Sequence, residues 1–260
     1  MKKIGIVTIN DYNNYGNRLQ CYALQRVLEK CNCIPENLKI TKSITAINII
    51  KKYIKIIMNY KNARISVSRE KRFTEFNNSI NFYKEEVKDG IVTPKLKKQL
   101  LDDFDNFIVG SDQVWNPNFK STKDINFLTF APSQLKNSYA ASFGIQELSE
   151  ECKQTYIEKL KDFNNISVRE DAGRDIIKNL MTREDVEVLL DPTFLLSAGE
   201  WDIVSKRPKQ LKAERYILNY FLGELAEEWK SEIEKIAIEN NCEIINILDK
   251  NSSFYATRTK

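Results

Sequence analysis

The chain opens with a short apolar block, followed by a polar block and then by a periodic apolar pattern. Within residues 4–9, Ile4, Ile6, Val7 and Ile9 form an apolar run rich in β-branched side chains, which is typical of a buried strand. Residues 10–16 are mostly polar, which predicts a loop. Beyond the loop, apolar residues recur three and four positions apart, as on the buried face of a helix, at Leu19, Ala23, Leu24, Val27 and Leu28. The pattern therefore predicts the first half of a βαβ unit.

The predicted loop is a candidate ligand site for two reasons. Loops at the carboxyl ends of strands bind ligands in open α/β sheets, and the free N–H groups at the start of the following helix favour an anion. The loop has one glycine, Gly16, so it is not the G-x-G-x-x-G dinucleotide fingerprint. An ordinary surface turn is the alternative interpretation.

Alternating strand and helix patterns continue to residue 204. Further strands are expected at residues 34–40, 104–109, 137–143, 166–168 and 186–190. Helices are expected at residues 43–60, 64–82, 96–101 and 148–163, and after residue 169. Such alternation predicts an α/β, Rossmann-like fold, in which a mostly parallel sheet has helices on both faces.

A change of pattern after residue 204 predicts a second domain. Residues 205–214 are polar, contain a proline and show no apolar period, so we interpret them as a linker after an N-terminal Rossmann-like domain of residues 1–204. Strand, helix and strand patterns then follow within residues 215–260. Two strands and one helix form a poor core by themselves. We therefore interpret residues 215–260 as the start of a truncated second Rossmann-like domain.

Composition narrows the functional classes. The 260 residues include 40 basic and 36 acidic side chains, and this mild net charge of +4 predicts no nucleic-acid partner. The five cysteines are scattered and no histidine is present, which favours free thiols in a reducing cytoplasm over a disulfide framework or a metal site. Without histidine, catalysis within this chain has to use carboxylates, Cys, Tyr, Lys or water. No signal peptide and no membrane span are expected.

One segment is strongly basic. Between residues 42 and 72 the chain has nine basic residues and a single acidic one, Glu70. The part that runs from Ser43 to Arg72 is amphipathic, and such a segment can lie on an anionic membrane surface. The alternative is an ordinary helix of the fold with a solvated face.

Polar residues follow five of the predicted strands, at residues 10–17, 111–116, 142–144, 167–171 and 191–193. The carboxyl ends of parallel strands lie along one edge of a sheet, so these segments are expected to converge on one crevice. This convergence, rather than any single loop, is the physical reason to predict a site there.

Three residues of these segments have open alternatives, and a fourth, Asp191, has one expected role. Asp112 is either a helix-capping residue or a site residue. Trp115 is either a core residue or a face on which a sugar ring stacks. Arg169 follows a predicted strand, where a guanidinium can bind a phosphate or carboxylate, or it pairs with a neighbouring acid, Glu170 or Asp171. Asp191 is expected to cap the turn before Pro192.

Five motifs together resemble one known family, the polysaccharide pyruvyl transferases. The motifs are NYGNRLQCYALQ at residues 14–25, FIVGSDQVWNP at 107–117, SYAASFG at 138–144, SVRE at 167–170 and LLDPTFLL at 189–196. Their order and spacing fit as well, and the resemblance covers residues 1–222. Each motif alone is unspecific, whereas the set is specific.

The resemblance implies a fold similar to GT-B glycosyltransferases, with two Rossmann-like domains that face each other across a cleft. It implies transfer of a pyruvyl group from phosphoenolpyruvate, as donor substrate, to a sugar of a bacterial cell-surface polysaccharide, with no further cofactor. It also suggests Arg169 as a donor-binding residue. On the acceptor side it suggests Asn14, Tyr15, Asn17, Arg18, Ser111, Asp112, Trp115 and Asn116.

The sequence departs from the family pattern in one respect. The family usually continues into a second domain with a histidine, in a segment like D-S-F-H-G, that is thought to be the general acid. This chain has no histidine. The explanations are a truncated gene product, which we favour, a partial chain whose other half is separate, or a diverged member that binds without catalysing.

Two other functions fit the same sequence. One is a glycosyltransferase of GT-B-like architecture that uses a nucleotide sugar. The other is a non-catalytic glycan-binding or membrane-peripheral module, in which residues 43–72 matter most. All of these predict a cytoplasmic location, at the inner face of the membrane where the basic segment binds lipid.

Overall fold

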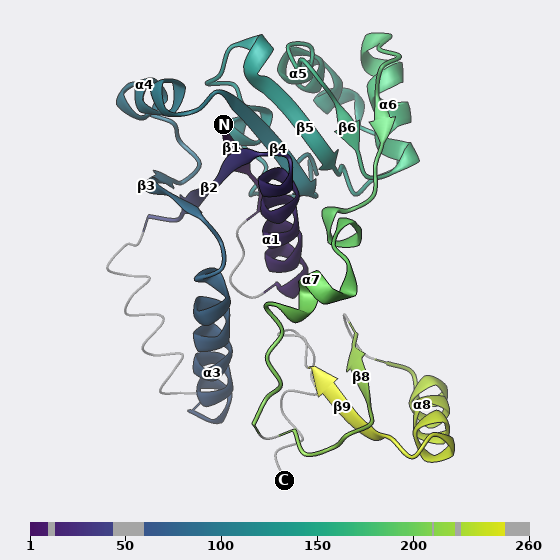
Figure 1. The fold of residues 1–260 in the computed structure, drawn as a ribbon. Coiled ribbons are helices and arrows are strands. Elements are labelled where there is room, and N and C mark those ends of the chain that lie inside the picture. Colours follow the sequence, from purple (N-terminus) through teal and green to yellow (C-terminus); the bar gives the residue numbers. More distant parts are fainter. Residues whose placement is uncertain (10–13, 44–59, 210, 222–224, 248–260) are drawn as a thin grey trace. The chain divides into compact units, whose positions relative to one another are not determined.

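The computed structural model describes residues 1–9, 14–43, 60–209, 211–221 and 225–247 (Figure 1). The chain divides into two compact units: Met1–Ile49 with Glu70–Val204, and Ile50–Arg69 with Ser205–Lys260. The helix predicted at residues 43–60 falls outside the described residues except at its two ends. The predicted domain boundaries and the GT-B resemblance stay predictions.

A seven-stranded parallel sheet forms the centre of the first unit. Its strand order is β3-β2-β1-β4-β5-β6-β7. Strands β2 and β3 therefore lie on one side of β1, and strands β4 to β7 lie on the other side. The predicted α/β, Rossmann-like fold is thereby confirmed. The strands are β1 (Lys2–Val7), β2 (Cys33–Thr41), β3 (Phe82–Lys88), β4 (Asn106–Asp112), β5 (Lys136–Ala141), β6 (Ser167–Val168) and β7 (Glu187–Val188).

Helices surround this sheet and bury it in two hydrophobic clusters. The larger cluster receives side chains from α4 (Pro94–Asp103), α5 (Glu150–Leu160) and α6 (Asp171–Met181). The smaller cluster joins α1 (Tyr15–Lys30) to the end of α3 (Tyr60–Asn77), to Leu196 directly after η3 (Pro192–Leu195) and to α7 (Ala198–Asp202). Along β1, Val7 belongs to the larger cluster, and its neighbour Ile6 points to the opposite face because side chains alternate along a strand.

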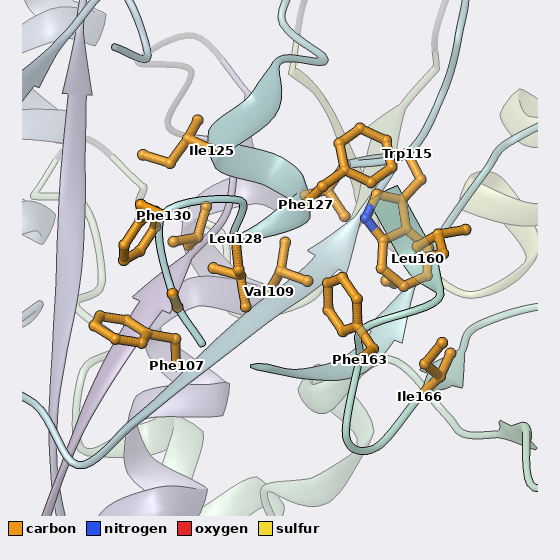
Figure 2. Packing of buried hydrophobic residues seen from close by; sticks show 14 of the residues in the cluster. Phe107, Val109, Trp115, Ile125, Phe127, Leu128, Phe130, Leu160, Phe163 and Ile166 are labelled. Carbon is orange, nitrogen blue, oxygen red and sulfur yellow. The ribbon is translucent and has the colours of Figure 1, made fainter. Parts of the chain in front are cut away.

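Trp115 belongs to the larger cluster, where it lies beside Phe127 (Figure 2). Its indole stacks on Phe127 at a centroid distance of 6.2 Å and meets Phe163 edge-on at 5.6 Å. Its Nε1–H donates to the carbonyl of Asn126 at 2.9 Å, which satisfies the polar atom of a fully buried side chain. Of the two alternatives, the structure therefore places Trp115 in the core.

Strand β3 is absent from the sequence prediction. A helix was expected over residues 64–82, but α3 ends at Asn77, and β3 then pairs in parallel with β2 at the edge of the sheet. Only Tyr83 and Val87 of this strand are buried. An edge strand exposes much of its surface, so the charged residues between these two positions obscure the alternation that would have revealed it.

Strand β4 is longer than predicted. The expected strand ended at residue 109, but the strand continues through Gly110 and Ser111 to Asp112. Gly110 has a φ of +113°, and a Cβ there would lie 2.3 Å from the carbonyl oxygen of Tyr139 on β5. A glycine is therefore required at this position for β4 to run close beside β5.

The second unit contains a strand–helix–strand motif. Strands β8 (Tyr216–Tyr220) and β9 (Glu243–Ile247) pair in parallel, and α8 (Glu227–Glu239) connects them. These elements match the strand, helix and strand predicted from the sequence. Across the described residues of both units, no helix has the length and apolar character needed to cross a membrane.

Candidate functional site

Four of the five predicted polar segments contribute described residues to a pocket at the carboxyl edge of the sheet, whereas residues 142–144 do not line it. The pocket lies in the first unit, where β1 and β4 are neighbours and the chain direction across the sheet reverses. Such a switch point is where open α/β sheets bind ligands. The cavity volume of about 530 Å³ is typical of a small-molecule site.

The start of α1 forms one wall of the pocket. Asn14 is the N-cap residue, and its side chain accepts a hydrogen bond from the backbone N–H of Asn17 at 3.2 Å. The first turn of the helix contains no acidic residue. The positive end of the helix dipole is therefore uncompensated by a carboxylate of its own first turn, which favours an anion nearby.

Asn17 and Gln20 connect this wall to the sheet. The Nδ2 of Asn17 donates to the carboxylate of Asp112 at the end of β4. The Nε2 of Gln20 donates at 2.8 Å to the hydroxyl of Thr8, which donates in turn to the carbonyl of Ser111 at 2.7 Å. The two amide oxygens, Oδ1 of Asn17 and Oε1 of Gln20, are buried without a hydrogen-bond partner among the described residues.

Asp112 has an unusual backbone. Its φ of +94° is rare for a residue with a side chain. Its Oδ1 accepts from the backbone N–H of Gln113 at 2.6 Å, and its Oδ2 accepts from Asn17. Residues held in sparsely populated backbone regions concentrate at functional sites. The structure thus positions a carboxylate in the pocket at the cost of backbone strain.

Asp191 joins the ends of three strands. Its Oδ2 accepts from the hydroxyl of Ser111 at 3.0 Å and from Nη1 of Arg169 at 3.1 Å. Its Oδ1 accepts from the backbone N–H of Thr193 at 3.0 Å and from the Thr193 hydroxyl at 2.8 Å. The predicted capping role of Asp191 is confirmed, since it is the N-cap residue of η3. The same carboxylate also fixes the guanidinium.

The ion-pair partner of Arg169 is Asp191, whereas the sequence suggested Glu170 or Asp171. Glu170 instead accepts from the hydroxyl of Ser142 at 3.0 Å and from the backbone N–H groups of Phe143 and Gly144. The pair with Asp191 uses only Nη1, so Nε and Nη2 of Arg169 have no hydrogen-bond partner within the described part of the chain. These two donors are available to a ligand in the pocket.

Four of the residues predicted from the sequence line the pocket together. They are Asn14 and Asn17 from α1, Asp112 from β4 and Arg169 from the end of β6. The acceptor and donor candidates therefore share one cavity.

The other five predicted residues lie outside the lining. Tyr15 packs its ring on Phe73 at 5.0 Å, Arg18 is buried in α1, and Trp115 is in the core. Ser111 is fully buried beneath the pocket, where it positions Asp191. Asn116 is also buried and stabilises its own loop, because its Nδ2 donates to Oε1 of Gln113 at 2.8 Å.

Sequence reasoning missed an apolar side of the pocket. Leu19, Phe194 and Trp201 all line the cavity. The sequence placed Leu19 on the buried face of its helix, and Phe194 lies in an apolar run that is typical of a core segment. Nothing local in the sequence distinguishes these side chains from core residues, and only the tertiary arrangement brings them to the pocket.

Tyr139 is a neutral side chain close enough to Asp191 to be affected by its charge. Burial and the nearby carboxylate of Asp191 raise the pKa of Tyr139, so its hydroxyl stays protonated at neutral pH. This hydroxyl donates to the carbonyl of Leu190 at 3.3 Å. Among the described residues, no three His, Cys, Asp or Glu side chains gather closely enough to hold a metal ion.

Comparison with known proteins gives one match. The family model "Polysaccharide pyruvyl transferase" matches residues 14–258, which is most of the chain and includes every residue of the pocket. No curated protein and no solved structure matches the chain significantly. The family expected from the sequence motifs is therefore confirmed, and the chain belongs to the polysaccharide pyruvyl transferase family.

Proposed function

We propose that this protein transfers a pyruvyl group from phosphoenolpyruvate to a pair of hydroxyls on a sugar of a bacterial cell-surface polysaccharide. The observation that supports this best is the meeting of Arg169, Asp112 and Asn17 in one pocket. A cation, a carboxylate and an amide in one cavity suit an anionic donor beside a hydroxyl-rich acceptor. Membership of the family supports the same reaction class.

The donor binds between Arg169 and the start of α1. Nε and Nη2 of Arg169 donate to the carboxylate or the phosphate of phosphoenolpyruvate, while Nη1 stays on Asp191. The N-terminus of α1 stabilises negative charge from the opposite wall. Because Asp191 accepts from Ser111 and Thr193 as well, the guanidinium is held in one orientation before the donor arrives.

The acceptor binds at Asp112 and Asn17. Asp112 accepts a hydrogen bond from a sugar hydroxyl and thereby makes the hydroxyl oxygen more nucleophilic. The unpartnered amide oxygens of Asn17 and Gln20 are further acceptors for hydroxyl groups.

The reaction forms a ketal and releases phosphate. Protonation at C3 of the enol makes C2 electrophilic, two sugar oxygens then bond to C2, and the bond from C2 to the phosphate oxygen breaks. The two hydroxyl protons balance the proton gained at C3 and the one that leaves with phosphate. The chain contains no histidine, so any proton donor within it is another titratable group or water.

The basic segment supports a second part of the proposal, which concerns location. We place the protein in the cytoplasm, with residues 43–72 in contact with an anionic membrane surface. Flotation with anionic vesicles, compared with a variant that replaces Lys51, Lys52 and Lys55 by glutamate, tests this contact. Loss of flotation in the variant is expected. Equal flotation of both proteins contradicts it.

Calorimetric titration with phosphoenolpyruvate tests the donor site directly. We expect binding to the full chain and loss of binding in Arg169→Ala. Arg174→Ala is the matched control, since Arg174 lies outside the pocket and pairs with Asp171 at 2.9 Å. The proposal fails if phosphoenolpyruvate does not bind, or if Arg169→Ala binds it as well as the wild type.

Product analysis then tests the reaction. Phosphoenolpyruvate and a soluble glycoside are incubated with the full chain, phosphate release is measured, and the glycoside is examined by mass spectrometry for a pyruvyl ketal. Asp112→Asn is expected to slow ketal formation while donor binding is retained. Release of nucleotide from a nucleotide sugar, with no phosphate from phosphoenolpyruvate, supports a glycosyltransferase instead.

A further inference from the structure

The pocket has an apolar side, and we propose that it binds the C–H face of the acceptor's sugar ring, with Phe194 as the stacking residue. We name the side chains of Leu19, Phe194 and Trp201 the apolar shelf. This inference rests on the proposed function, because it specifies how the acceptor lies in the same pocket. It adds a residue that the five motifs did not suggest as an acceptor contact.

Phe194 lies in η3, between two buried positions. Its backbone N–H donates to the carbonyl of Asp191 at 3.0 Å within η3. Pro192, two positions before it, is buried, and Leu196, two positions after it, packs into the smaller cluster against α1. Between these two buried positions, Phe194 is 73% exposed and lines the pocket.

The other two residues add apolar side chains to the same cavity. Trp201 packs its ring 5.7 Å from that of Tyr22, and its Nε1–H donates to the carbonyl of Thr193 at 3.3 Å. Leu19 is 39% exposed and reaches the pocket from α1. A single exposed apolar side chain is ordinary. Here two exposed side chains, Leu19 and Phe194, line one cavity together with the partly buried Trp201, and the three form a surface for an apolar ligand face.

A sugar ring fits this combination of surfaces. Its hydroxyls lie at the edge of the ring and its C–H groups form an apolar face, so it can bond to polar groups and stack on an aromatic ring at the same time. The pocket supplies both: Asp112 and Asn17 are hydrogen-bonding groups, and Phe194 is an aromatic surface. Trp115, the other aromatic considered for stacking, is fully buried and unavailable to a ligand.

Saturation-transfer NMR tests the shelf with methyl β-glucoside and methyl β-galactoside as probes. Neither probe has an aromatic aglycone that would stack by itself. We expect transfer from protein aromatic protons to the ring C–H protons of at least one glycoside. Phe194→Ala is expected to weaken binding about three- to ten-fold, the size of a lost aromatic contact. Phe194→Tyr retains the ring and is expected to bind like the wild type.

The matched control is Phe119→Ala, which removes an exposed phenylalanine outside the pocket and is expected to change nothing. The inference is overturned if neither glycoside binds the wild type, or if Phe194→Ala binds as tightly as Phe119→Ala. It is also overturned if Phe194→Ala weakens binding of uridine diphosphate but not of a glycoside, because the shelf then binds a base. Phosphoenolpyruvate is titrated separately. If phosphoenolpyruvate does not bind, the proposed function is contradicted. Loss of glycoside binding in Phe194→Ala supports the apolar shelf and does not bear on donor binding.

Discussion

Replacing Arg169 by lysine tests whether the geometry of the guanidinium, rather than its charge alone, binds the donor. In the wild type, Nη1 donates to Oδ2 of Asp191 at 3.1 Å and leaves two donors of the same rigid group for a ligand. Lysine retains the positive charge but has a single ammonium on a flexible stem. It cannot hold Asp191 and an anion with the same fixed geometry.

The magnitude follows from the bonds that change. A hydrogen bond to a charged group contributes about 1.5–3 kcal/mol, so loss of one donor to the phosphoenolpyruvate anion predicts about 30-fold weaker binding. The effect on folding is smaller. The ion pair is partly exposed, with 31% of the Arg169 side chain accessible, and Asp191 retains the bonds from Ser111 and Thr193. We therefore expect less than about 1 kcal/mol of destabilisation.

Calorimetry and thermal unfolding measure the two quantities separately. Arg169→Lys should bind phosphoenolpyruvate about 30-fold more weakly and shift the melting temperature by less than about 4 °C. Arg174→Lys, on the exposed side of α6, should change neither quantity. A lysine variant with wild-type affinity would refute the reasoning, because charge alone would then suffice. A large fall in melting temperature with affinity unchanged would assign Arg169 a structural role.

Three further predictions concern the fold around the site. Gly110→Ala should destabilise the protein by at least about 2 kcal/mol in urea unfolding, because the φ is +113° and the new Cβ would meet a carbonyl oxygen of β5 at 2.3 Å. Gly199→Ala has open space around it, so it should cost nothing. Burial raises the pKa of Tyr156, whose hydroxyl donates to a buried carbonyl. The unfolded chain ionises first, so the free energy of unfolding should fall as pH rises above about 10, and Tyr156→Phe should reduce that dependence. Burial raises the pKa of the Cys21 thiol to about 12, so a thiol reagent at neutral pH should label exposed Cys31 and leave Cys21 unmodified in peptide mass spectra.

Most of the sheet was predictable because strand patterns are local. The strands expected at residues 4–9 and 34–40 correspond to β1 and β2, and four of the five polar segments after the strands contribute to one pocket. Strand β3 was missed because its charged residues hide its alternation at the edge of the sheet. The extension of β4 to Asp112 was missed because it depends on close packing of Gly110 against β5, which no local pattern records.

The site was predicted in outline but not in its contacts. Asn14, Asn17, Asp112 and Arg169 line the pocket as expected. The sequence suggested a neighbouring acid as the partner of Arg169, whereas the partner is Asp191, 22 positions away. Proximity in the chain is a poor guide to ion pairs at strand ends, since successive side chains of a strand point to opposite faces, whereas residues on neighbouring strands can share a face.

The sequence by itself determined the family, the α/β class and the edge of the sheet at which a site forms. Hydrophobic periodicity and turn residues act over a few positions, and the order of strand and helix follows from them. Only the tertiary structure decided which strands are neighbours and therefore which side chains meet. The order β2-β1-β4 brings α1 beside Asp112, and Asp191 bonds Ser111 across 80 positions of chain. The same packing buries Trp115 and exposes Phe194, because side-chain burial depends on what lies opposite in space rather than on what precedes or follows in the chain.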